Sequence, residues 1–183
     1  MEMDTDLALM ILSFFRVIIF IVFLLSSLGK IQSFSAFQES IEDMQILPSR
    51  ATILAAFLVI GSELMIVILM LTPRPIVLFG FLLAGVLLTV FIFVLISVLR
   101  RNLPVSCNCF GANNEKVSKA DIFRNVIFLT CAIVGGSLVA FFPVAQNMEF
   151  AIRALLITSF PAAIFTLICL NLKTFSFIIV NTT

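Results

Sequence analysis

The sequence predicts an all-α integral membrane protein: a four-helix transmembrane bundle with a fifth transmembrane helix and one amphipathic interfacial helix. Of its 183 residues, 62% are hydrophobic and only 11% are charged, whereas about a quarter of a globular domain is charged. The apolar residues gather in five runs, each near the roughly 20 residues that a helix needs to cross a bilayer. No period of about 20 to 50 residues repeats, so residues 1–183 are expected to form a single transmembrane helical domain.

The first half of the chain contains two predicted spans joined by an amphipathic segment. Span one covers about 7–28 and is interrupted by Arg16, and span two covers about 51–71 and is interrupted by Glu63. Between them, residues 31–47 place apolar side chains at three- and four-residue spacing among acidic and amide residues. This spacing is typical of a helix that lies in the membrane interface on one apolar face.

Pro73 and Pro75 end span two, because a helix does not continue through two prolines so close together. Span three then covers about 76–99. The longest polar stretch of the chain follows at 100–121. Any site outside the spans is therefore expected in this stretch.

Span four is predicted at about 122–142, after Ser118 and Asp121, which have the spacing of a capping box at a helix start. Span five is predicted at about 150–170. The segment 143–183 thus adds one helix, and a tail too short to cross, to a four-helix unit.

Two charged residues fall well inside predicted spans, where an unpaired charge costs about 2.5–3.5 kcal/mol. At 1.5 Å per residue, Arg16 lies about 14 Å and Glu63 about 12 Å from the same membrane edge. Because these depths match, we predict an intramembrane ion pair between Arg16 and Glu63, acting either as a structural clamp or as part of a functional polar pocket.

Composition excludes several classes of function. The net charge is +1 and no long basic run occurs, so nucleic acid is not an expected partner. The chain has no histidine, tryptophan or tyrosine, which removes histidine acid–base chemistry and His-ligated metals or haem. The expected partners are the lipid bilayer and proteins in the membrane or at its surface.

The four cysteines are Cys107, Cys109, Cys131 and Cys169. The last two fall inside predicted spans, so the four are not expected to converge on zinc, and no metal site is predicted. Two cysteines separated by one residue close only a tight ring, and strained, exposed disulfides tend to be labile. The pair Cys107 and Cys109 therefore forms either a redox-active couple or, alternatively, a permanent disulfide or inert thiols.

The loops after spans one and three share one face of the membrane, because each pair of crossings returns the chain to the same side. Cationic residues gather on this face: Lys30, Arg50, Arg100, Arg101, Lys116, Lys119 and Arg124. Positive charge and a nearby helix N-terminus both favour thiolate over thiol. Positive-inside counting places this face in the cytoplasm, whereas disulfide chemistry on exported proteins requires the opposite face.

The order of these landmarks resembles the MauE family, within the wider DoxX-like group of redox-associated membrane proteins. The matching residues are Arg16, Gly29-Lys30, Leu47-Pro48, Glu63-Leu64, Cys107-Asn108-Cys109-Phe110-Gly111 and Arg124-Asn125. The most specific element is the C-x-C-F-G run followed about a dozen residues later by R-N. The resemblance covers residues 7–142. The family usually has glycine at the position of Asn108.

This resemblance implies a four-helix redox scaffold in a bacterial inner membrane that supports disulfide formation or maturation of an exported partner, often beside a thioredoxin-like protein. Cys107 and Cys109 would be catalytic, supported by Phe110, Gly111, Lys30, Arg100, Arg101, Arg124 and Asn125. A quinone would be a suitable lipid-soluble electron acceptor. The alternative is a non-catalytic membrane subunit that docks and stabilises another membrane protein, with C-x-C as a structural staple.

Overall fold

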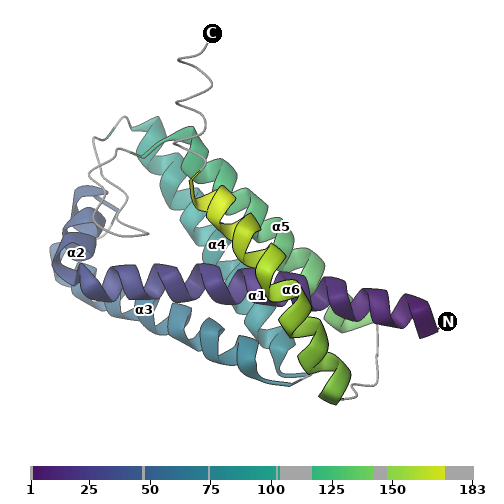
Figure 1. Cartoon of the computed structure of the whole chain (residues 1–183). Coiled ribbons are helices and arrows are strands. Elements are labelled where there is room, and N and C mark those ends of the chain that lie inside the picture. The colour runs from purple at the N-terminus through teal and green to yellow at the C-terminus, as the bar shows by residue number, and fades with distance from the viewer. Residues whose placement is uncertain are drawn as a thin grey trace, which may run out of the picture.

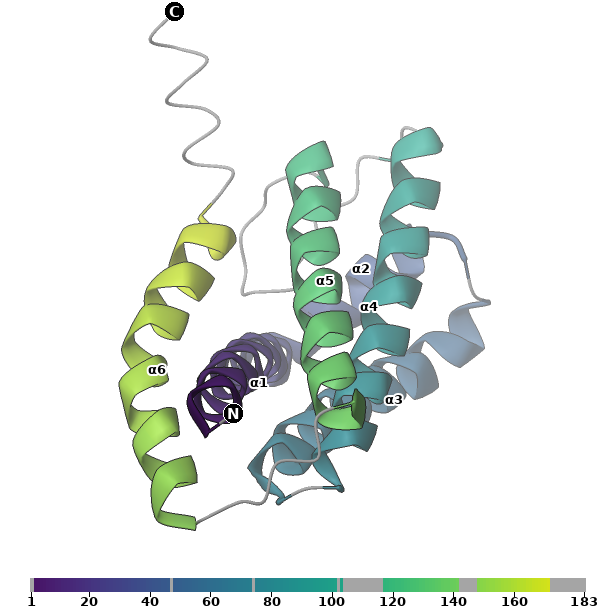
Figure 2. The same ribbon diagram turned by 90° about the vertical axis from the view of Figure 1, so that its right-hand side faces the viewer.

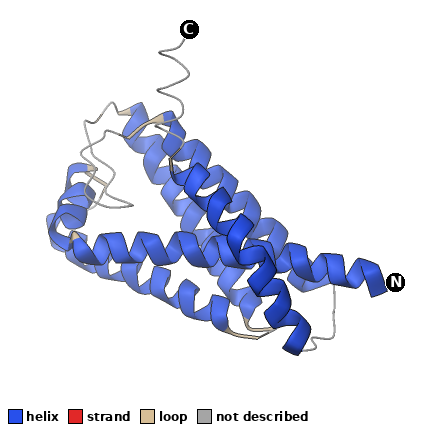
Figure 3. Ribbon diagram, viewed as in Figure 1, coloured by secondary structure: helices blue, strands red, loops and turns tan. Residues whose placement is uncertain are grey.

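The computed structural model is a bundle of helices, as predicted (Figures 1 and 3). It describes residues 2–46, 48–73, 75–101, 103, 117–141 and 148–171. Six helices, and no strand, lie in these ranges: α1 (Glu2–Gln32), α2 (Phe34–Asp43), α3 (Ser49–Leu71), α4 (Val77–Arg100), α5 (Lys119–Phe141) and α6 (Met148–Leu170). All except α2 are long and apolar enough to cross a membrane, which confirms the five predicted spans.

The helix ends follow local signals that the sequence carries. α5 begins directly after Ser118, whose backbone N–H donates to Oδ2 of Asp121 at 2.8 Å and whose hydroxyl donates to the same oxygen at 3.2 Å. This is the reach-back contact of a capping box, and it satisfies a backbone group at the helix start that has no helical partner. α1 differs from its prediction most, because it extends beyond both ends of 7–28.

The amphipathic segment forms α2, which is shorter than the predicted 31–47. Its inward face carries Phe37, which packs against Ala56 and Ile60 of α3. Acidic residues of the same helix, Glu39 and Glu42, are exposed. α2 therefore separates apolar and polar faces as predicted, and its apolar face is covered by α3.

α1 runs through the middle of the bundle. Figure 2 looks nearly along α1, with α6 on one side of it and α5 on another. α3, α5 and α6 all pack on α1, and α4 packs on both α3 and α5. The main core joins Ile18 and Phe23 of α1 to Phe81 of α4 and Phe128 of α5.

α4 and α5 approach each other closely in this core. A Cβ atom at Gly135 would overlap the ring of Phe81, so only glycine lets the two helices come this near. α6 lies outside the predicted four-helix unit, yet its Ala162 and Cys169 join the same core. The fifth span is therefore packed on the bundle rather than loosely attached.

Candidate functional site

The two most buried charges among the described residues are Lys30, in the last turn of α1, and Glu63 of α3. Lys30 and Glu63 are both 0% exposed, and Nζ of Lys30 forms an ion pair with Oε1 of Glu63. The ammonium also lies 5.3 Å from the ring centroid of Phe37 and 5.1 Å from that of Phe91. A cation over aromatic faces gains further electrostatic attraction, so the charge of Lys30 is balanced inside the bundle.

Ser26 completes this polar cluster. It lies one helical turn before Lys30, on the same face of α1. Its hydroxyl accepts a hydrogen bond from Nζ of Lys30 at 2.8 Å and donates one to Oε1 of Glu63 at 3.0 Å. The second carboxylate oxygen of Glu63, Oε2, accepts no hydrogen bond from the described residues. A buried acceptor without a donor is costly, so this oxygen is able to receive a donor from a bound molecule.

The predicted ion pair between Arg16 and Glu63 is wrong. Glu63 pairs with Lys30, and the Arg16 guanidinium instead donates from Nε to the carbonyl of Met70 and from Nη2 to the carbonyl of Thr72, the latter at 2.7 Å. α3 ends at Leu71 and Thr72 caps it, so these carbonyls belong to the last turn and the C-cap, where helical N–H partners run out. The negative end of the helix dipole also attracts a cation there.

The error came from the register of α1 against α3. The prediction assumed that both helices meet the membrane edge at the same level, but α1 is longer at both ends. As a result Arg16 lies beside Met70 and Lys30 lies beside Glu63. Glu63 and Met70 are seven residues apart, which is about 10 Å along a helix. Arg16 is therefore displaced by about this distance from the level of Glu63, and Lys30 pairs with the carboxylate instead.

Two of the predicted supporting residues of the loop, and a third cation of the predicted basic face, lie at its two ends. Arg100 and Arg101 close α4 and are exposed, and Nη1 of Arg101 donates to the carbonyl of Gln45 at 3.4 Å. Lys119 opens α5 and is also exposed. Positive charge thus remains near both ends of the polar segment.

Two other predicted supporting cations have acidic partners. Lys30 is held by Glu63 inside the bundle rather than at the loop. Nη2 of Arg124 lies 3.4 Å from Oδ1 of Asp121, and both side chains are nearly buried. Asn125 follows Arg124 and donates from its amide to the carbonyl of Asp121 at 2.8 Å. The charges of Lys30 and Arg124 are thus largely balanced by neighbouring carboxylates.

The predicted catalytic pair, Cys107 and Cys109, and the neighbouring Phe110 and Gly111 lie outside the described residues. The residues on either side of the polar segment are described. Leu103 and Val117 both pack with Val94, Val98 and Met44 in a small apolar cluster. We call this cluster the loop base; it ties the end of α4 and the approach to α5 to the end of α2.

The remaining cysteines lie in the core. Cys131 is 6% exposed and Cys169 is 4% exposed, and both are free thiols in the main hydrophobic cluster. Within the described ranges, no group of three or more histidine, cysteine or acidic residues is placed to hold a metal ion.

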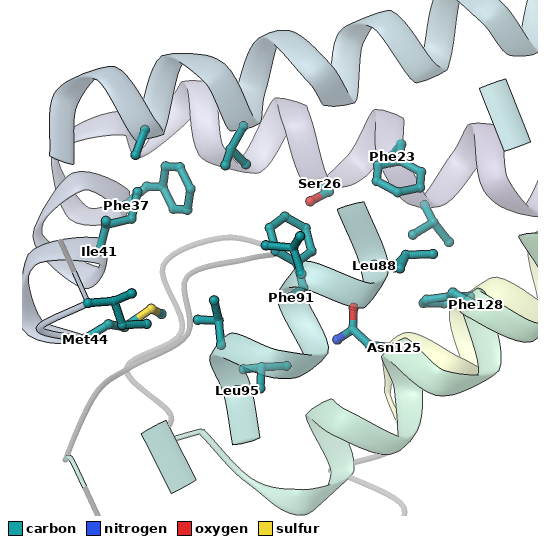
Figure 4. Close-up of a pocket in the computed structure, with 16 residues that line it drawn as sticks. Phe23, Ser26, Phe37, Ile41, Met44, Leu88, Phe91, Leu95, Asn125 and Phe128 are labelled. Atoms are coloured by element: carbon teal, nitrogen blue, oxygen red, sulfur yellow. The ribbon is translucent and has the colours of Figure 1, made fainter. Parts of the chain in front are cut away.

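A cavity of about 250 Å³ opens between the polar cluster and the loop base (Figure 4). Its wall is mostly apolar and includes Phe37, Phe91 and Phe128, with Ser26 and Asn125 as the polar contributions. In Figure 4, Asn125 extends from α5 toward the space beside Phe91 and Phe128. Sequence reasoning missed this cavity. One signal was available: Ser26 and Lys30 have the i,i+4 spacing that places both on one face of a helix.

Compared with known protein families, residues 8–138 match the family described as methylamine utilisation protein MauE. This segment includes most of α1, all of α2 to α4, the C-x-C motif and nearly all of α5, and leaves α6 outside, as the resemblance implied. Neither the curated proteins nor the solved structures gave a significant match. Five membrane-length helices and a family match over most of its length make this chain a multi-pass membrane protein that belongs to the MauE family.

Proposed function

We propose that this protein is a membrane thiol–disulfide redox protein that supports disulfide formation or maturation of a partner protein through Cys107 and Cys109. The observation that carries the proposal is the C-x-C pair itself: two cysteines in the longest polar segment of the chain, inside the matched family region. The redox chemistry, the partner and the acceptor are parts of this proposal.

The surroundings of the polar segment support this function. The loop base packs Leu103 and Val117 against the bundle, so both ends of the segment are held. Arg100, Arg101 and Lys119 present exposed positive charge at those ends, and the first turn of α5 adds the positive end of a helix dipole. Both effects favour the thiolate, which is the attacking form in disulfide exchange.

The proposed reaction transfers two electrons. A thiolate of the partner attacks the disulfide between Cys107 and Cys109 and forms a mixed disulfide, and the second partner thiol then resolves it. The partner leaves with a disulfide, and the C-x-C pair is left as two thiols. To act again, the pair must lose two electrons and two protons to an acceptor, for which a membrane quinone is the expected chemical class.

The test is alkylation of the four cysteines in the full-length protein in detergent, after equilibration in glutathione buffers. Cys107 and Cys109 should switch between labelled and protected states together and react rapidly near neutral pH. Cys131 and Cys169, which are buried in the core, should react slowly in both conditions and serve as the internal control. Loop cysteines that react no faster than these two, or that resist both oxidation and reduction, would refute the proposal.

A second candidate is the non-catalytic subunit. A groove between α4 and α5 favours it, since the small residues Gly85, Ala132 and Gly136 line it together with the exposed rings of Phe93 and Phe141. Small residues let a neighbouring transmembrane helix approach closely. The double change Cys107→Ser and Cys109→Ser separates the two functions: it abolishes partner oxidation under the redox proposal and leaves assembly and function intact under the subunit alternative.

A further inference from the structure

The cavity beside Ser26 and Asn125 has the features of a site for a neutral ring. Phe37, Phe91 and Phe128 contribute aromatic walls, which favour planar partners through stacked or edge contacts. Lys30, which lies over the rings of Phe37 and Phe91, is paired with Glu63, so a charged ligand gains no counter-ion from it. A ligand that is apolar over most of its surface and polar at a few points fits this wall.

The polar points of the cavity come from two sides. On α5, one amide N–H of Asn125 is used by the carbonyl of Asp121, and the amide extends into the cavity (Figure 4). On α1, Ser26 lines the cavity and is bonded to the carboxylate of Glu63. Oε2 of that carboxylate is buried and receives no donor from the described residues. One side of the cavity thus presents the amide donor of Asn125. The other side presents Ser26, and the oxygen Oε2 of Glu63, an acceptor without a donor from the described residues, lies behind it.

The cavity also touches the loop base. Met44 and Val94 line the cavity and belong to the cluster that holds Leu103 and Val117. These last two residues stand on either side of the segment that contains the C-x-C motif. The wall of the cavity and the base of the proposed redox segment are therefore one continuous packing unit.

Two further lining residues, Val90 and Ile46, are 49% and 43% exposed. The cavity therefore reaches the outside of the bundle at these positions. A molecule with its ring inside has a route for a hydrophobic tail into lipid.

We propose that this cavity binds the ring of an isoprenoid quinone, with its tail in the surrounding lipid. A quinone is neutral and planar and carries carbonyl oxygens for Asn125, and its quinol form carries hydroxyl donors for the polar side of the cavity. Resting on the proposed function, this inference names the acceptor site. The two thiols at Cys107 and Cys109 lose two electrons and two protons and form one S–S bond, while the quinone gains both and becomes the quinol.

The test exploits the absence of tryptophan and tyrosine from the chain. In the variant Phe91→Trp, the indole lies in the cavity wall and is the only indole of the chain. The matched variant Phe93→Trp places the indole two residues further along α4, at a position that is 69% exposed. Added ubiquinone-1 or menadione, with the protein in phosphatidylcholine vesicles, should quench the indole at position 91 with saturation. At position 93, quenching should rise linearly with the quinone dissolved in the lipid.

Further variants assign the site. Asn125→Leu in the Phe91→Trp background should raise the half-saturating quinone concentration about tenfold, through loss of one hydrogen bond. Ala55→Phe narrows the cavity and should abolish saturation, whereas Leu58→Phe, on the outer face of the same helix and 64% exposed in the native protein, should leave it unchanged. Helical content by circular dichroism checks that each variant folds.

Linear and equal quenching at positions 91 and 93 would overturn the inference. So would competition by a decyl alkane as effective as that by the quinone, since the cavity would then be a generic acyl-chain pocket. All binding measurements are repeated with Cys107→Ser and Cys109→Ser, where binding should persist. Loop cysteines that cycle without any saturable quinone binding would refute the quinone site alone, and saturable binding with inert cysteines would refute the redox function.

Discussion

Lys30 and Arg16 are two cations on the same helix, and the bundle accommodates them in different ways. Lys30 is 0% exposed and is held by a carboxylate, a serine hydroxyl and two aromatic rings. Arg16 is half-buried and is held by two carbonyls at the end of α3. One cation has a full counter-charge, and the other uses the partial charges of a helix terminus.

The difference shows that carbonyl groups at a helix end can take part in holding a cation inside the bundle. A guanidinium presents several donors in a fixed plane and so bridges two carbonyls, whereas an ammonium is a compact charge that gains most from a single carboxylate. Lys30 is therefore held by side chains whose charge and hydrogen bonding suit an ammonium, while Arg16 donates to carbonyl groups that any helix end would offer.

The largest effect is expected at the buried ion pair. Glu63→Leu or Lys30→Met alone should lower the free energy of unfolding by about 3–5 kcal/mol, because each leaves one buried charge without a partner. The double variant should recover most of that loss. Denaturation in mixed detergent–SDS micelles measures all three. A double variant at least as unstable as the single ones would contradict a paired arrangement.

A smaller loss is expected at Arg16. Arg16→Leu should cost about 1.5–3 kcal/mol, the range for hydrogen bonds to a charged group, and Arg16→Lys should recover only part of it, because an ammonium lacks the planar fork. The same denaturation assay applies. Combined with Glu63→Leu, the Arg16→Leu loss should add within about 0.5 kcal/mol. A coupling well above this value would restore the Arg16–Glu63 contact that the structure lacks.

The smallest effect is expected at Ser26, which joins the ion pair without carrying charge. Ser26→Ala should cost about 1 kcal/mol through lost hydrogen bonds. Ser27→Ala is the matched control, since the neighbouring hydroxyl is also buried but donates only to the carbonyl of Leu24 in its own helix. Equal losses in the two variants, measured by thermal denaturation in detergent, would show that Ser26 contributes no more than an intrahelical bond.

Sequence reasoning located the helices because their signals are local. Apolar runs of membrane length marked the five spans, and the spacing of Ser118 and Asp121 marked the start of α5, where the capping contact is present. The amphipathic pattern around Phe37 likewise identified α2 and its inward face. In each case, one stretch of chain was sufficient.

The candidate site depends on relations between helices, and these were harder to predict. Hydropathy sets the length of a span but not its register against a neighbour, so Glu63 was paired with Arg16, and Lys30 was assigned to the loop face. The actual partner of Glu63 depends on α1 continuing to Gln32. The cavity depends on five helices at once, and no short-range pattern marks Phe91 or Asn125 as sharing a wall.

The positions of the partners of Arg16 and Lys30 also bear on how the chain enters the membrane during synthesis. Both cations belong to α1, and the groups that hold them here belong chiefly to α3. Inserted alone, α1 would carry Arg16 well inside the bilayer at a cost of about 2.5–3.5 kcal/mol, and Lys30 in its last turn would lack the carboxylate that holds it here. α1 is therefore a poor independent span and becomes a good one only once α3 has been made, so the first two crossings are expected to enter the bilayer as a pair.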